Sequence, residues 1–68
     1  MASVYRILID DPSGRFRAGD LGEECQNDFV KYDYKIRLQR PPCLVEVERP
    51  VLVAPVFYFM ANEVEQVS

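Results

Sequence analysis

Residues 31–38 alternate without a break between charged and apolar side chains. The charged positions are Lys31, Asp33, Lys35 and Arg37, and the apolar positions are Tyr32, Tyr34, Ile36 and Leu38. In a helix this pattern would scatter the apolar side chains around the whole cylinder, whereas in a strand it places all of them on one side. The segment therefore predicts an antiparallel strand with one buried face and one charged face in water.

Turn residues and prolines divide the rest of the chain into short stretches of strand-forming residues. A helix over 44–59 would be broken by Pro50 and Pro55, at a cost of about 3 kcal/mol each. Residues 60–63 are too few for an α-helix but suit a single 3₁₀ turn. No segment keeps the 3.6-residue period of a helix, so the sequence predicts an all-β protein. We expect further extended segments at 4–9, 21–26, 44–48, 51–53, 56–59 and 64–67.

The length of 68 residues allows a single domain over 1–68, because a second hydrophobic core would have nothing to be built from. Short strands without a covering helix must bury their apolar sides in another way. Closing the sheet on itself does this, and it also removes exposed sheet edges. We therefore expect an all-β, five-stranded, partly open barrel with a single 3₁₀ turn before its last strand.

The apolar faces of the expected strands define the expected core, and a one-residue slip in register would exchange the two faces of a strand. A core of this size gives marginal stability, so a partner subunit would help the chain to stay folded. The expected core comprises Tyr5, Ile7, Ile9, Leu21, Cys25, Tyr34, Ile36, Leu38, Val47, Val53, Phe57, Phe59, Val64 and Val67.

The net charge of −3 is unevenly distributed along the chain. Residues 1–40 hold seven basic and seven acidic side chains, whereas residues 41–68 hold only Arg49 against four glutamates. Nucleic-acid binding normally leaves a basic footprint, so an acidic chain argues against it unless the positive charges cluster on one face. No apolar run reaches the ~18 residues of a membrane span, and the N-terminus has no apolar stretch like that of a signal peptide. We expect a cytoplasmic protein that does not enter a membrane.

The residues that usually carry catalysis or hold a metal are scarce. The chain has no histidine, so a Ser-His or Cys-His pair cannot be assembled. Cys25 and Cys43 are the two thiols, and without histidine or a Cys-x-x-Cys motif they cannot complete a zinc site. They could form one disulfide in a secreted chain, whereas in the cytoplasm we expect them to be reduced. We expect no enzyme activity, no cofactor and no metal.

Three stretches carry a resemblance to known proteins: Gly19–Glu23 with its Gly-x-x-Gly turn, Tyr34–Leu38, and the aromatic strand with its Asn-Glu-Val-Glu ending at 57–67. Together they resemble the SH3-like barrels of a small accessory chain of photosystem I, of the variable chain of ferredoxin-thioredoxin reductase, and of small phage proteins. The resemblance implies a non-catalytic SH3-like barrel that docks on a larger partner as an accessory subunit. True SH3 domains use a Tyr-Asp-Tyr like that at 32–34, but their polyproline groove typically needs a tryptophan, which this chain lacks.

Two groups of residues are candidates for binding. Arg15, Phe16 and Arg17 lie between two turns, in a loop that we expect to be exposed. Arginine and aromatic residues are enriched among those that dominate interface energies, so Phe16 is either a partner anchor or folds back to cap the mouth of the barrel. The second group, Lys31, Lys35 and Arg37, forms a positive stripe on one strand face.

The sequence favours a protein-binding accessory module, phage-encoded or part of a larger assembly, whose partner is another protein. One alternative is a nucleic-acid-binding barrel that uses the basic residues at 15, 17, 31, 35 and 37 together with aromatic stacking. The other alternative is a homo-oligomer formed through the apolar segment 44–59.

Overall fold

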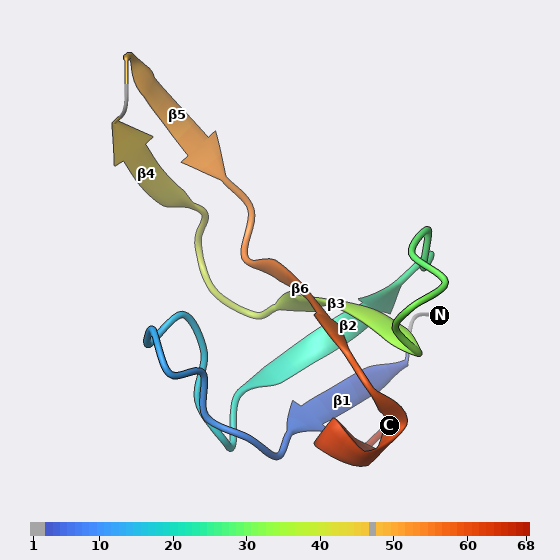
Figure 1. Cartoon of the computed structure of the whole chain (residues 1–68). Coiled ribbons are helices and arrows are strands. Elements are labelled where there is room, and N and C mark those ends of the chain that lie inside the picture. The colour runs from blue at the N-terminus through green and yellow to red at the C-terminus, as the bar shows by residue number, and fades with distance from the viewer. Residues whose placement is uncertain (1–2, 47) are drawn as a thin grey trace.

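The computed structural model describes residues 3–46 and 48–68, and it is all-β apart from one 3₁₀ turn (Figure 1). The extended segments expected at 4–9, 21–26, 44–48, 51–53, 56–59 and 64–67 each contain a strand, and the expected 3₁₀ turn precedes the last one. The all-β prediction is therefore confirmed. The elements are β1 (Val4–Ile7), β2 (Leu21–Cys25), β3 (Tyr34–Leu38), β4 (Cys43–Glu46), β5 (Pro50–Val53), β6 (Val56–Phe59), η1 (Ala61–Glu63) and β7 (Val64–Gln66).

Five of the strands form one curled antiparallel sheet in the order β6-β3-β2-β1-β7. The sheet is a half-barrel, open between its edge strands β6 and β7, and it is compatible with a small SH3-like barrel. The predicted five-stranded, partly open barrel is confirmed at this level. η1 is the only helical element in the described part of the chain, and with three residues it is far too short to cross a membrane.

The remaining strands, β4 and β5, form a separate two-stranded antiparallel ribbon. We call residues 43–53 the arm. Figure 1 shows that the arm projects away from the five-stranded sheet, to which it is joined before β4 by the segment after β3 and after β5 by the start of β6. Among the described strands, β4 and β5 are paired only with each other.

The strand predicted at 31–38 begins three residues later, because Asn27 organises the preceding segment into turns. Its side-chain Oδ1 accepts a hydrogen bond from the backbone N–H of Phe29 (2.9 Å), and its Nδ2 donates to the carbonyl of Tyr32 (2.6 Å). Asn side chains commonly form such local bonds in competition with strand pairing. The chain therefore enters β3 only at Tyr34.

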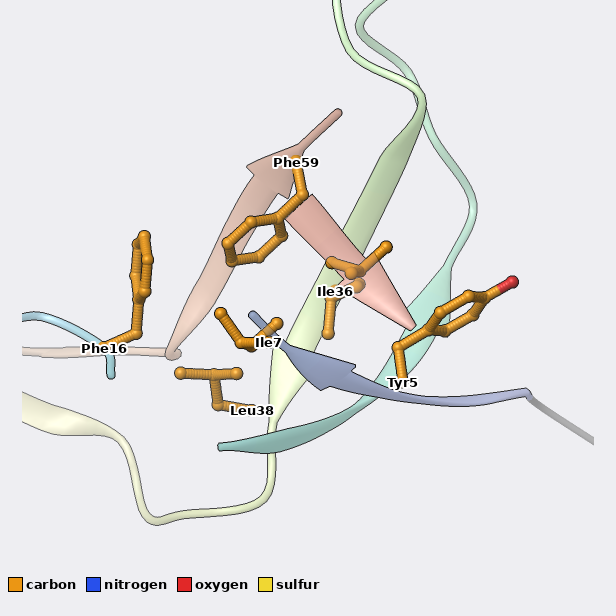
Figure 2. Packing of buried hydrophobic residues seen from close by; sticks show 7 residues of the cluster. Tyr5, Ile7, Phe16, Ile36, Leu38 and Phe59 are labelled. Carbon is orange, nitrogen blue, oxygen red and sulfur yellow. The ribbon is translucent and has the colours of Figure 1, made fainter. Parts of the chain in front are cut away.

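The buried cluster lies on the concave side of the sheet, where Figure 2 shows its side chains pointing toward one another. Most of the expected core residues are in it or packed against it. Burial also raises the pKa of Tyr5 to about 12, with a smaller contribution from its hydrogen bonding. The buried residues are Tyr5, Ile7, Phe16, Ile36, Leu38, Phe59 and Val64, and Ile9, Tyr34 and Phe57 pack against them.

Leu21 is wrongly placed by the sequence prediction, because the register of β2 is slipped by one residue from the expected one. Leu21 is opposite Arg6 and shares its outward face, whereas Gly22 is opposite Tyr5 and faces inward. A glycine contributes no apolar signal, so the alternation in β2 was read from the wrong positions. Cys25, on the same outward face as Leu21, is half-buried and carries a free thiol.

Two more expected core residues are exposed. Val53 belongs to the arm rather than to the sheet, and Val67 lies just beyond the end of β7. The prediction that Val53 and Val67 are buried is therefore wrong. Val47 lies outside the described residues.

Candidate functional site

An open groove of about 750 Å³ runs along β6, the edge strand of the half-barrel. Its lining comes from both faces of β6, from the loop at 8–20, from the loop at 26–33 and from the root of the arm. We call it the β6 groove. Aromatic side chains dominate its wall, and two arginines lie at its rim. The residues that matter for the argument are Arg15, Phe16, Phe29, Arg40, Phe57 and Tyr58.

The loop at 8–20 is fixed by carboxylates that accept hydrogen bonds from its own backbone and side chains. Asp11 accepts from the Arg15 Nε (2.7 Å) and backbone N–H (2.9 Å), and from the Ser13 hydroxyl (2.6 Å). The hydrogen bonds from Arg15 and then from Ser13 hold the pKa of Asp11 well below its usual range. Asp10 and Asp20 accept from the backbone N–H groups of residues 18 and 17. The pair Asp10-Asp11 thus has a structural role as a turn cap.

Phe16 folds back into the core from this loop, and only 7% of its surface is exposed. Its ring packs edge-on against Phe57 at 5.2 Å and Phe59 at 5.0 Å between centroids. Of the two roles left open by the sequence, the one observed is the cap on the half-barrel. The expectation that the whole loop is exposed is wrong for Phe16 and confirmed for Arg15 and Arg17.

A second aromatic cluster lies on the outer side of β6. Tyr58 is within 5.5 Å of Phe29 and 5.7 Å of Tyr32, and the rings of Phe29 and Tyr32 are 5.3 Å apart. The Tyr58 hydroxyl donates a hydrogen bond to Asp28 Oδ1 (2.7 Å), which lowers the pKa of Asp28 and raises the pKa of Tyr58. The alternating pattern of residues 31–38 concealed this cluster, since it assigned Tyr32 to a strand. The turn-forming Asn27 was the available signal.

The predicted positive stripe is only partly free to bind a partner. Lys35 lies 3.5 Å from Asp28 and over the ring of Tyr58, and Lys31 lies over the ring of Tyr32. Lys35 and Arg37 are on the same outer face of β3, with Arg37 exposed. The structure therefore brings two of the three cations onto the outer aromatic cluster, where a carboxylate already neutralises one of them.

The two arginines at the rim differ in what they contact. Arg15 forms its ion pair with Asp11 and lies over the ring of Phe57, 5.3 Å from its centroid. Arg40 donates through Nη2 to the backbone carbonyl of Arg15, which is not an ionic contact. Within residues 3–46 and 48–68, Arg40 has no carboxylate partner. The sequence did not single it out, because nothing local brings residue 40 beside residue 15.

The arm leaves its apolar residues in water. Leu44 is 61% exposed and Leu52 is 69% exposed, and Val51 and Val53 are exposed as well. Leu44 and Leu52 are directly opposite each other in the β4–β5 register. The arm therefore presents an apolar surface that nothing in the described part of the chain covers.

The groove and the arm offer contacts rather than reactive groups. Among residues 3–46 and 48–68, no three His, Cys, Asp or Glu side chains are grouped so that they could hold a metal ion. The polar groups of the groove are engaged in turns and ion pairs, as with Asp11 and Asp28. Its chemistry is that of an aromatic surface with positive charge at the rim. No protein-family model matches this chain, and comparisons with curated proteins and with solved structures likewise find no match.

Proposed function

We propose that this chain is a non-catalytic protein-binding module that contacts another protein chain through the arm and the β6 groove. The observation that carries the proposal is the isolated ribbon β4–β5 with Leu44 and Leu52 exposed. A two-stranded hairpin alone is marginally stable in water and needs a further strand, a helix or another surface against its apolar face. A protein partner would supply that surface.

The groove adds a second reason. Exposed apolar patches on small proteins mark interaction sites, and aromatic and arginine side chains are enriched at interfaces. Both kinds of residue meet along β6, with Tyr58 and Phe57 on opposite faces of the strand and Arg40 at the rim. An accessory subunit of a larger assembly, including one encoded by a phage, is consistent with this surface and with the resemblance noted from the sequence.

The nucleic-acid alternative is supported less well. Aromatic rings beside Lys31 and Lys35 resemble a base-stacking platform. However, Asp28 lies 3.5 Å from Lys35, and Asp11 is paired with Arg15, so two of the five cations that this function needs are neutralised. Phosphate binding depends on unpaired positive charge. We therefore retain protein binding as the proposal.

Site-specific photo-crosslinking in cells that express the chain tests this function. A benzophenone side chain at position 52 is expected to form crosslinks to polypeptide, because Leu52 projects from the arm into the proposed interface. The same probe at position 8 is the matched control, because Leu8 is an exposed apolar residue outside the arm and the groove. Equal yields of crosslinked polypeptide at positions 52 and 8 would contradict the proposal.

A further inference from the structure

One face of the arm combines an apolar pair with a negative charge. Leu44 and Leu52 are opposite each other across β4 and β5, and both are largely exposed. Glu46 is two residues along β4 from Leu44, so its side chain lies on the same face, about 7 Å further along the strand. Glu46 is also exposed. We call this the leucine face of the arm.

The β6 groove carries the complementary pattern. Phe57 and Tyr58 supply aromatic surface, and Arg40 at the rim has no carboxylate partner in the part of the chain that the structure describes. The nearby Arg15 is already paired with Asp11, so Arg40 is the cation left for an incoming carboxylate. An apolar pair followed by a carboxylate matches an aromatic wall followed by a free guanidinium.

We infer that the arm of one copy of this chain docks on the β6 groove of a second copy, and that the contact is reciprocal. The leucine face lies on the aromatic wall of the groove, and Glu46 pairs with Arg40 of the other copy. This inference rests on the proposed protein-binding function and names the partner as a second copy of the same chain.

The position of the arm supports a reciprocal contact. Val53, Ala54 and Pro55, at the root of the arm, line the groove, yet the arm itself projects away from the sheet (Figure 1). An arm that starts at the rim of one groove and points outward is placed to reach the corresponding groove of a symmetry-related copy. In a two-fold dimer the same patch serves both copies, so each contact is made twice.

The surface area required is within reach of these two elements. A stable interface buries about 800 Å² on each partner, which is about a sixth of the 5165 Å² that the chain exposes. Each copy contributes both its arm and its groove to the interface. The charge distribution is also favourable, because the acidic surplus lies in residues 41–68 and the groove cation lies in residues 1–40.

Sedimentation equilibrium of the pure full chain, with reversed charges at the two paired positions, tests the inference. The unmodified chain is expected to form a reversible dimer with a dissociation constant in the micromolar range or below. Arg40→Glu and Glu46→Arg are each expected to weaken the dimer about tenfold or more, because each places like charges together. The combined variant is expected to recover to within about threefold of the unmodified chain, since the pair is restored with its charges exchanged.

Two further variants separate loss of the contact from loss of the fold. Glu23→Arg makes the same charge change on β2, away from the arm, and is expected to leave the dimer unchanged. Leu52→Ser removes apolar surface from the arm alone, so it is expected to abolish the dimer while the half-barrel keeps its thermal melt. A chain that remains monomeric at about 500 μM, or a combined variant no stronger than the single ones, would overturn the inference.

The outcomes also separate this inference from the proposed function. If the pure chain is monomeric but the probe at position 52 still crosslinks to a different polypeptide, the second-copy inference is overturned and protein binding stands. If the chain is monomeric and position 52 crosslinks no more than position 8, both are overturned. Crosslinks between differently tagged copies of the chain support both.

Discussion

Replacing Phe59 by alanine is expected to leave most of the chain unfolded at 25 °C. Phe59 is 1% exposed, and its ring packs against that of Phe16 at the centre of the buried cluster (Figure 2). Truncating a fully buried phenylalanine costs about 3–5 kcal/mol, because apolar burial is lost and a cavity remains. A core in a chain of this length supplies about 3–5 kcal/mol of net stability in total. The loss is therefore of the same size as the whole stability.

Circular dichroism with a urea titration measures the effect. The Phe59→Ala chain is expected to show no cooperative transition, whereas Val30→Ala, at a fully exposed loop position, is expected to unfold like the original chain. A Phe59→Ala chain with an unchanged urea midpoint would mean that the aromatic cluster is not the stabilising core.

Replacing Gly22 by alanine is expected to have the next largest effect. A Cβ at position 22 would lie 2.4 Å from Ile36 Cγ2 and 2.7 Å from the backbone carbonyl oxygen of Arg37. The Ile36 side chain is completely buried and the second obstacle is backbone, so neither can move away easily. Overpacking of this kind costs about 1–3 kcal/mol, and more when the backbone must shift.

The matched control for Gly22→Ala is Glu23→Ala, on the exposed face of the same strand. Thermal denaturation followed by circular dichroism is expected to show a large fall in the melting temperature for Gly22→Ala and a small change for Glu23→Ala. Equal melting temperatures for the two variants would show that β2 does not approach β3 as closely as the structure has it.

The sequence predicted most of the half-barrel because each strand of the sheet is encoded by its own local alternation. The segment at 34–38 kept its apolar positions, and Ile36 and Leu38 are buried as expected. β2 failed in a specific way, since the inward position is Gly22 and the apolar Leu21 next to it faces outward. Where the buried position has no side chain, a period of two cannot reveal which face is inside.

The candidate site was less predictable because it depends on distant contacts. Phe16 is buried by residues 57 and 59, and Arg40 reaches the carbonyl of residue 15, so neither position is explained by its neighbours in the chain. Local patterns carry no information on such pairs.

The arm shows a different limit of sequence reasoning. The prolines at 50 and 55 correctly predicted short strands, but apolar residues such as Val53 were assigned to the core of the barrel. Apolar composition predicts that a surface will be covered, and it does not say whether the same molecule covers it. The segment 44–59, which suggested a homo-oligomer from the sequence, contains most of the exposed arm.

Amide hydrogen exchange at two protein concentrations tests most directly the claim that the arm is a docking element. In dilute solution the amides of β4 and β5 are expected to exchange quickly, because a lone two-stranded ribbon opens readily. At concentrations well above the dimer dissociation constant they are expected to slow by at least about tenfold, while the amides of Ile36 and Leu38 in β3 stay unchanged. Exchange in the arm that is the same at both concentrations would contradict the account.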